Sequence, residues 1–211
     1  WGGLAGWMAR HYGVHVTGVT VSVEQAKLAR ERCADLLVDI DVRDYREIEG
    51  QFDRIVSVGM FEHVGQKNYR TFFSKTRSLL KSQGLFLLHT IGAGRDGFAT
   101  DRWIEKYIFP NGVLPPASAL ARHAGAFFTI EDWHNFGADY DPTLMAWYHN
   151  FNKAWPTLKA HYGERFKRMF DYYLLASAGS FRSRENHLWQ LVLSAGGLDG
   201  GYRTPRWSPA D

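Results

Sequence analysis

The sequence is poor in cysteine, has no long apolar run and carries little excess charge. Its single cysteine, Cys33, can form neither an intrachain disulfide nor a multi-cysteine metal site, and we predict no metal site. The 25 Lys and Arg residues are nearly balanced by 22 Asp and Glu, which argues against a polybasic protein that binds nucleic acid. No apolar run approaches the roughly 20 residues that a transmembrane helix needs. These absences fit a protein of a reducing compartment such as the cytoplasm, which would meet lipid only at a surface.

The 211 residues are rich in hydrophobic and aromatic side chains. Hydrophobic residues make up 45% of the chain, and Phe, Trp and Tyr make up 15%. A chain of this length and composition is typical of one globular domain, so we predict a single domain over residues 1–211. The rings are more numerous than a core of this size usually needs. We therefore expect some of them to line a site.

Segments typical of strands and helices alternate over the first 92 residues. The β-branched segment 14–21 predicts a strand buried on both faces. Ser22 and Gln25 then form the pattern of a helix-capping box. Further strands are predicted at 36–40, 52–59 and 85–92, with a helix at 69–84. This order predicts an α/β fold with a doubly wound, mostly parallel sheet.

The second half of the chain departs from this alternation. Glycine and proline are frequent between residues 93 and 126, which predicts an irregular lid or cap. Strands are expected at 127–134 and 188–194. Between them, two apolar stripes at helical spacing predict two helices. We therefore expect cap insertions at about 93–126 and 140–182.

The chain opens with WGGLAGWMARHYG, a glycine turn followed by a helix, and no strand stands before them. In doubly wound folds the first strand runs into such a turn, where the ligand binds. Spacing alone leaves two interpretations open. Either the sequence begins partway through the ligand-binding turn of a longer protein, or residues 1–3 are an ordinary chain start.

Five segments carry long and chemically unusual strings: FDRIVSVGMFEHVG, FLLHTIG, WIEKYIFPNGVLP, EDWHNFGADYDPTLMAWY and ERFKRMFDYYLLASAGSFRSR. They resemble the bacterial cyclopropane-fatty-acyl-phospholipid synthases, which are related to the mycolic acid cyclopropane synthases. The resemblance extends to about residue 195 and implies a Rossmann-like class I S-adenosylmethionine-dependent methyltransferase fold with helical cap insertions. In that family a D-x-G-C-G tract directly precedes W-G-G. We therefore expect that the first strand is missing here and that the chain is truncated at its N-terminus.

The resemblance also implies a site for the cofactor S-adenosylmethionine near the first two predicted strands. The positions that match the family's cofactor contacts are Trp1, Gly2, Thr20, Val21, Ser22, Gln25, Arg43 and Asp44. From the residues alone, Ser22 and Gln25 could equally serve only to cap a helix. Asp44 could accept a hydrogen bond from the exocyclic amine of adenine, or it could be an exposed loop acid.

Methyl transfer to an isolated cis double bond needs alignment, a dry cavity and a base that removes a proton so that the ring closes. In the resembled family this base is a bound bicarbonate. The positions that match its ligands are Glu62, His89, Ile91 and Tyr140. Glu62 follows one predicted strand, and His89 and Ile91 end the next, so all three should reach the same edge of the sheet.

Each of these residues also has a structural interpretation. A histidine inside an apolar strand, such as His89, is by default a core residue with its hydrogen bonds satisfied. Glu62 and His63 could form a simple surface pair, or His63 could be the group near the substrate. Tyr140 could only anchor the turn from Asp139 to Pro142, although its phenol is a donor that suits an anion.

The resemblance predicts an enzyme that transfers a methylene group from S-adenosylmethionine to the cis double bond of unsaturated acyl chains of membrane phospholipids. Ring closure would pass through a carbocation that bound bicarbonate deprotonates. We expect a cytoplasmic protein, associated peripherally with the inner face of the membrane, with phospholipid acyl chains and no nucleic acid as partners. A homodimer is left open. Arg165, Lys167 and Arg168 of one predicted helix could contact an anionic membrane or be simply solvated.

Two alternatives accompany this prediction. A related fatty acyl C-methyltransferase would use the same fold and cofactor and stop at a methyl-branched product. An inactive fragment would bind lipid or nucleoside without catalysis. The structure of the product distinguishes the C-methyltransferase from a ring-forming enzyme. Binding of adenosylhomocysteine tests whether the chain is an inactive fragment.

Overall fold

The computed structural model describes residues 1–97 and 101–205. The contacts between residues divide the chain into two compact units, Trp1–Gly50 and Gln51–Asp211. No helix in the described ranges is both long enough and apolar enough to cross a membrane.

The first unit contains two parallel strands and two helices. Its elements are α1 (Gly3–Tyr12), β1 (Val16–Thr20), α2 (Val23–Arg32) and β2 (Val38–Val42), followed by the short 3-10 helix η1 (Tyr45–Glu47). Both helices bury small residues, Gly6 and Ala9 in α1 and Ala26 and Ala29 in α2. Small side chains let these helices pack closely against the strand pair and against each other.

The turn before α1 depends on glycine. Gly2 has a φ of 82°, which L side chains rarely adopt, and a Cβ there would lie 2.9 Å from the Cα of Ala29. The carbonyl of Gly2 accepts a hydrogen bond from the N–H of Gly6 at 2.9 Å. A residue larger than glycine would therefore push α1 away from α2.

The second unit is built on a four-stranded sheet in the order β3-β4-β6-β5. Its elements are β3 (Phe52–Val58), η2 (Phe61–His63), η3 (Gln66–Asn68), α3 (Tyr69–Leu79), β4 (Leu80–Ala93), α4 (Arg102–Tyr107), α5 (Ala117–Gly125), β5 (Thr129–Asn135), α6 (Gly137–Leu158), α7 (Glu164–Arg182) and β6 (Asn186–Ser194). β3 and β4 are parallel, and β6 is antiparallel to both of its neighbours, so only β6 runs against the direction of the other three strands. A mostly parallel sheet agrees with the α/β prediction.

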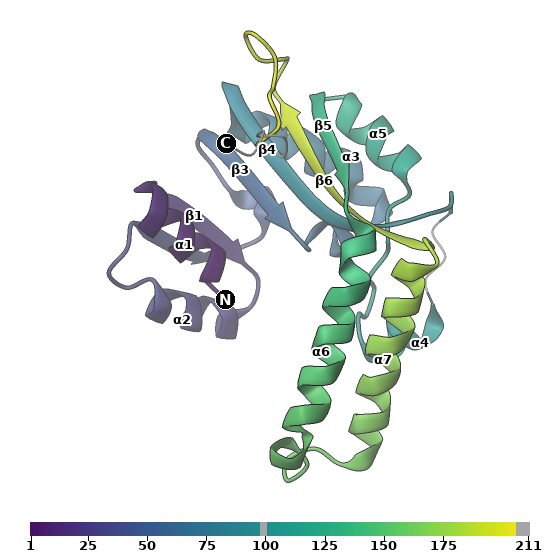
Figure 1. The fold of residues 1–211 in the computed structure, drawn as a ribbon. Helices are drawn as coiled ribbons and strands as arrows, with labels where there is room; N and C mark the ends of the chain where they lie inside the picture. The colour runs from purple at the N-terminus through teal and green to yellow at the C-terminus, as the bar shows by residue number, and fades with distance from the viewer. Residues whose placement is uncertain (98–100, 206–211) are drawn as a thin grey trace, which may run out of the picture. The chain divides into compact units, whose positions relative to one another are not determined.

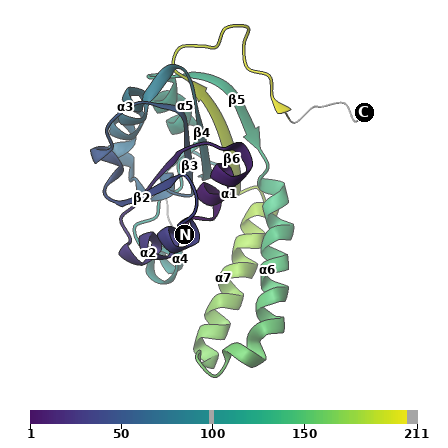
Figure 2. The ribbon, with the colours of Figure 1, turned by 90° about the vertical axis from the view of Figure 1, so that its left-hand side faces the viewer.

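Helices of the second unit serve two different purposes. α3 and α5 contact each other and pack on β4 and β5, respectively, as Figure 1 shows. α6 and α7 instead form a long hairpin that extends away from the sheet, and the two helices lie side by side in both views (Figures 1 and 2). This hairpin covers the predicted insertion at 140–182.

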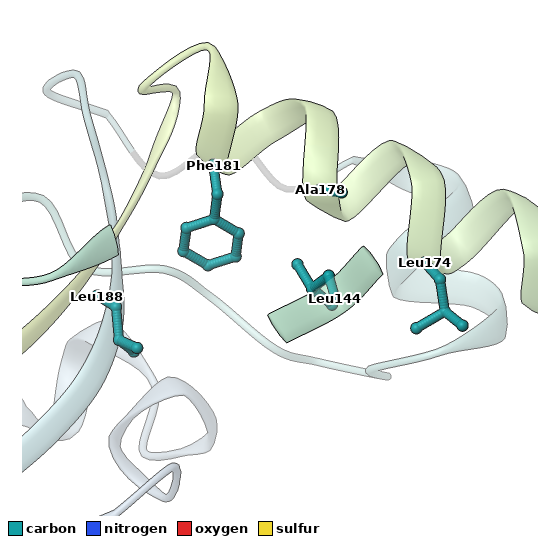
Figure 3. Packing of buried hydrophobic residues seen from close by; sticks show 5 residues of the cluster. All are labelled: Leu144, Leu174, Ala178, Phe181 and Leu188. Atoms are coloured by element: carbon teal, nitrogen blue, oxygen red, sulfur yellow. The ribbon is translucent and has the colours of Figure 1, made fainter. Parts of the chain in front are cut away.

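The hairpin is held by its own hydrophobic cluster. Leu144 of α6 faces Leu174 and Phe181 of α7, and Leu188 of β6 closes the end toward the sheet (Figure 3). All four side chains are at most 2% exposed. Partly buried aromatic residues of α6 and α7 pack around them, so several of the rings noted in the sequence belong to this core.

Two sequence-based expectations are wrong in detail. The helix predicted at 69–84 ends at Leu79, and Leu80 already belongs to β4. Gly84 does not stop a helix but lies where the register between β3 and β4 shifts, and a Cβ there would meet the Leu80 side chain at 2.6 Å. The segment 93–126 is less irregular than expected, because it contains α4 and α5.

We expect Leu174→Ala to lower the free energy of unfolding by about 2–5 kcal/mol, because it leaves a cavity between α6 and α7. Leu175→Ala is the matched control on the same helix, since Leu175 is 43% exposed, and should change the value by at most about 0.5 kcal/mol. Urea denaturation measures both. Equal losses in the two variants would contradict the packing described here.

Candidate functional site

Glu62 is the most deeply buried acid among the predicted site residues. It lies in η2, directly after β3, and its side chain is only 8% exposed. Its Oε1 accepts a hydrogen bond of 2.8 Å from the backbone N–H of Ile91, near the end of β4. Its Oε2 is buried and has no hydrogen-bond partner in the described part of the chain. Burial raises the pKa of Glu62, which favours the neutral acid.

The backbone around Glu62 is fixed as well as its side chain. Its carbonyl accepts a hydrogen bond of 2.8 Å from Val113, in the segment between α4 and α5. Further along that segment, the Pro115 carbonyl accepts from the N–H of Ala93 at 3.0 Å. The segment predicted to form a lid is therefore tied to the ends of both β3 and β4.

His89 and Ile91 lie on the same half-buried face of β4, because side chains two apart in a strand point the same way. The Nε2 of Gln190 in β6 lies 3.1 Å from the Nδ1 of His89. An amide NH₂ can only donate, so in this arrangement Nδ1 accepts and the ring proton lies on Nε2. Burial lowers the pKa of His89, which keeps the ring neutral.

Tyr140 reaches the same region from the first turns of α6. It packs against the hydrophobic cluster of the hairpin, as does Ile91, and its ring contacts Phe181 at 4.9 Å between centroids. Burial raises the pKa of Tyr140, and the nearby charge of Glu62 raises it further. The turn at the start of α6 has a separate anchor, since Arg182 donates two hydrogen bonds to Asp141 at 2.8 and 2.9 Å.

His89 and Tyr140 offer neutral hydrogen-bond donors, and burial of Glu62 favours the neutral form that can donate as well. A protonated Glu62 has an O–H, His89 keeps its Nε2–H, and Tyr140 has its phenol O–H. Glu62 contacts the end of β4 directly and lies close enough to Tyr140 to shift the pKa of the phenol. Such a set suits a small anion, because donors without formal charge avoid repulsion while the buried setting strengthens each hydrogen bond.

Three further residues take part in this region but lacked a signal in the sequence. Gln190 lies opposite His89 only because β4 and β6 pair in that register. Tyr69 is fully buried, and burial raises its pKa to about 12, with a smaller contribution from Glu62. The pKa of Tyr173 in α7 is raised by burial and then by Tyr140. Tyr173 belongs to a stripe of rings at helical spacing, which is typical of a core but could also face a cation, and no pattern in the sequence marks Tyr69 as a site residue.

His63 differs from its neighbour Glu62. It is exposed, and its ring contacts Phe109 at 6.2 Å between centroids. Since Glu62 is buried and bonded to Ile91, the two residues do not form the simple surface pair considered from the sequence.

In the first unit, the tract from Thr20 to Gln25 forms one hydrogen-bonded group. Ser22 caps α2 by accepting from the N–H of Gln25 at 3.2 Å. In a capping box the backbone N–H of Ser22 would donate directly to the Gln25 side chain. Here the Thr20 hydroxyl lies between them: it accepts from the N–H of Ser22 at 3.1 Å and donates to the Gln25 side chain at 2.9 Å. Val21, between them, is 77% exposed. The tract thus presents an ordered polar edge at the end of β1.

Of the remaining predicted cofactor contacts of the first unit, Asp44 and Arg43 have local side-chain partners, whereas Trp1 is exposed. Asp44 receives hydrogen bonds from the backbone and guanidinium of Arg46, which lower the pKa of Asp44 to about 2. Arg43 pairs with Asp41 at 3.2 Å. Trp1 is 61% exposed. Asp44 therefore stays ionised, and its Oδ2, which accepts one hydrogen bond from Arg46, still has a lone pair with which to accept another.

Comparison with known proteins places these residues in a familiar setting. The family model described as mycolic acid cyclopropane synthetase matches residues 1–191. The cyclopropane-fatty-acyl-phospholipid synthase of Escherichia coli K12 is 57% identical over 206 residues, which cover 98% of this chain and 54% of that protein. A probable fatty acid methyltransferase of Pseudomonas putida is 35% identical over 223 residues, covering 100% of this chain and 56% of that one. The chain thus spans about half the length of these curated relatives.

Solved structures give the same result for the fold. The cyclopropane synthase MmaA2 of Mycobacterium tuberculosis superposes with a TM-score of 0.84 at 24% identity, covering 92% of this chain and 74% of that one. The mycolic acid cyclopropane synthase CmaA1, in complex with SAH and CTAB, gives 0.84 at 27% identity with the same coverage. The predicted Rossmann-like methyltransferase fold is confirmed, and so is the family resemblance.

The burial of Glu62 predicts a pH dependence of stability. The folded chain holds this proton more tightly than the unfolded chain, whose pKa is near the ordinary 4.5. The resulting stabilisation is complete below that value and is lost as the pH rises through the folded pKa. As the pH rises above about 4.5, we therefore expect the free energy of unfolding of the unchanged chain to fall more steeply than that of the Glu62→Gln variant.

Urea denaturation at a series of pH values measures this difference. Glu49→Gln is the matched control, because Glu49 is exposed, and it should follow the unchanged chain. Parallel pH curves for the unchanged chain and Glu62→Gln would show that Glu62 is not held in a buried site.

Proposed function

We propose that this chain, which belongs to the mycolic acid cyclopropane synthetase family, is the catalytic part of an enzyme that builds cyclopropane rings on lipids. The reaction is the transfer of a methylene group from S-adenosylmethionine to the cis double bond of unsaturated acyl chains in membrane phospholipids. The substrate class comes from the name of the Escherichia coli relative. The observation that carries the proposal is Glu62, a buried acid with one oxygen held by Ile91 and the other left without a partner in the described ranges.

The reaction sets clear requirements for the protein. The π electrons of the alkene attack the methyl carbon of the sulfonium, the carbon–sulfur bond breaks, and adenosylhomocysteine leaves. A C–H bond of the transferred methyl group then breaks and the proton leaves. The electron pair of that bond forms the carbon–carbon bond that closes the ring. The alkene needs no activation, so the site must align it, exclude water and provide a base.

Three of the four predicted ligands fit a bound bicarbonate as that base, whereas the backbone N–H of Ile91 is donated to Glu62 instead. When bound, bicarbonate supplies the acceptor for the proton that leaves before ring closure. Glu62 would donate from its neutral carboxyl group, His89 from Nε2 and Tyr140 from its hydroxyl. The buried, unpartnered Oε2 of Glu62 supports this assignment, because a buried polar atom without a partner is costly unless a ligand satisfies it.

A carboxylate in direct contact with the carbocation would be alkylated. The hydrogen bond to Ile91 holds Glu62 at the end of β4, and Glu62 acts in the proposal only through the anion that it orients. Ile91, Phe136 and Tyr140 border the hydrophobic cluster of the hairpin. These apolar surfaces would keep water away from the cation, and aromatic faces add about 0.5–2 kcal/mol of attraction for a positive charge.

S-adenosylmethionine is assigned to the polar edge formed by Thr20, Ser22 and Gln25, together with Gly2 and Asp44. The ordered hydroxyl and amide groups of this tract fit the hydroxyls of a ribose, and the ionised Asp44 fits an exocyclic amine. Arg43, Val21 and Trp1 complete the proposed contacts. We also propose that the protein is cytoplasmic and attaches to the inner face of the membrane. A homodimer stays a prediction.

Incubation of the chain with S-adenosylmethionine and vesicles of unsaturated phospholipid tests the reaction. Mass spectrometry should show acyl chains that have gained one CH₂ group, and proton NMR should show ring protons without new vinyl protons. A methyl-branched product would favour the related methyltransferase reaction. Absence of any product together with absence of adenosylhomocysteine binding would overturn the proposal and leave a non-catalytic fragment.

Substitutions at Glu62 should affect turnover according to their hydrogen-bonding capacity. We expect Glu62→Leu to reduce ring formation about 100-fold or more, the usual cost of removing one donor from an anion-stabilising site. Glu62→Gln should keep more activity, because its amide can still accept from Ile91 and donate to the anion. Calorimetry with adenosylhomocysteine is the control and should give equal affinities. Full activity of Glu62→Leu would exclude the proposed role.

The cofactor assignment predicts a loss of affinity in Thr20→Val. This change removes the hydroxyl that joins Ser22 to Gln25, and we expect adenosylhomocysteine to bind the chain about tenfold more weakly by calorimetry. Thr17→Val is the matched control on the same strand, because Thr17 is exposed. Unchanged affinity in Thr20→Val would move the nucleoside away from this tract.

A further inference from the structure

A second site candidate, which Glu62 does not line, lies between α4 and α7. Here a surface pocket of about 300 Å³ is lined by Trp103, Tyr107, Arg165, Arg168, Met169 and Tyr172. Its walls come from two helices that are joined by rings, since Trp103 and Tyr172 meet edge to face at 4.5 Å between centroids. The pocket is thus a feature of the folded second unit and not of a single helix.

The two arginines of this pocket have no partner among the residues that the structure describes. Arg165 and Arg168 are exposed and take part in no ion pair or hydrogen bond of the described residues. The acid one turn further along α7, Asp171, is already bonded to Lys167 at 2.6 Å. The arginines are therefore available to bind an anion from outside the chain.

The surroundings of the pocket carry more positive than negative charge. Across α4 and the segment from residue 164 to 172 there are five cationic and three acidic side chains. A neighbouring hollow contains Arg102, Glu105 and Lys106. A surface of this kind attracts anions, and Arg suits phosphate because its planar guanidinium donates two parallel hydrogen bonds.

Exposed apolar rings border the same surface. Tyr172 is 52% exposed and Tyr107 is 40% exposed, and both line the pocket. Tyrosine and tryptophan prefer the boundary between water and lipid, where the ring body meets acyl chains and the polar end meets headgroups. Free arginines beside such rings match a bilayer surface better than a soluble anion, which would leave the rings in water.

We propose that the pocket between α4 and α7 binds the phosphate group of an anionic phospholipid in a bilayer, with Arg165 and Arg168 as its ligands. The inference rests on the proposed function for its choice of lipid, and it assigns to this face the contact with the membrane. Trp103, Met169 and Tyr172 contact the apolar part of the same lipid. The pocket holds a lipid headgroup apart from the reacting acyl chain, so it brings the protein to its substrate without entering the chemistry.

Sedimentation with vesicles tests the proposal without any reaction. Vesicles of pure phosphatidylcholine are compared with vesicles containing phosphatidylglycerol, in the absence of S-adenosylmethionine. The chain should bind the anionic vesicles more tightly. Arg165→Gln with Arg168→Gln should weaken that binding at least about tenfold, given about fivefold for each charge near a membrane surface.

Matched variants distinguish binding at the pocket from attraction of the vesicles by exposed arginines elsewhere on the protein. Arg122→Gln with Arg203→Gln removes two exposed arginines from other elements and should leave binding to anionic vesicles within about twofold. Arg165→Lys with Arg168→Lys keeps the charge but loses the guanidinium fork and should bind several-fold more weakly. Tyr172→Ser should also weaken binding.

Three results would overturn the proposal. The first is an equal loss of vesicle binding in the Arg165→Gln, Arg168→Gln variant and in the Arg122→Gln, Arg203→Gln variant. The second is unchanged vesicle binding of the Arg165→Lys, Arg168→Lys variant. The third is displacement of the chain from vesicles by millimolar glycerol phosphate. Product formation and adenosylhomocysteine affinity are measured separately on the same variants. Loss of vesicle binding with unchanged adenosylhomocysteine affinity supports the pocket, whereas lack of product in every variant counts against the proposed function alone.

Discussion

The hydrogen bond from the Ile91 N–H to Glu62 is the constraint on which the candidate site depends. It joins the turn after β3 to the end of β4, so an acid that would otherwise face water is fixed inside the second unit. Burial then raises the pKa of Glu62 and leaves its other oxygen without a partner in the described chain. A buried acid of this kind is costly for stability. A hydrogen bond from Glu62 to a bound anion would offset this loss of stability.

The sheet and the hairpin make that arrangement possible in different ways. Parallel β3 and β4 bring their carboxyl ends to one edge, and antiparallel β6 places Gln190 opposite His89. The α6–α7 hairpin adds Tyr140 and a hydrophobic cluster that ends at the same strands. Glu62, His89 and Gln190 of the site thus come from the strands and from the turn after β3, whereas Tyr140 and the apolar cover come from helices.

Much of the site could be predicted because its residues follow strands. The order of strands and helices implied that Glu62 and Ile91 would reach one edge, and the family strings pointed to His89 and Tyr140. Helix ends were less accurate, because the sequence 80–84 forms a strand with a bulge only when paired with β3. Whether Asp44 binds a nucleoside stays a prediction, since its bonds to Arg46 are local.

The sequence by itself determined the α/β class, the positions of most strands, the capping of α2 by Ser22 and the family, because these depend on local pattern and on strings of neighbouring residues. Only the tertiary structure decided that Gln190 faces His89, that Tyr69 and Tyr173 lie near the acid and the phenol of the site, and that Arg165 lines one pocket with the rings of α4. These contacts join residues far apart in the chain. Strand register and helix packing create them, and no short-range pattern in a single sequence encodes either.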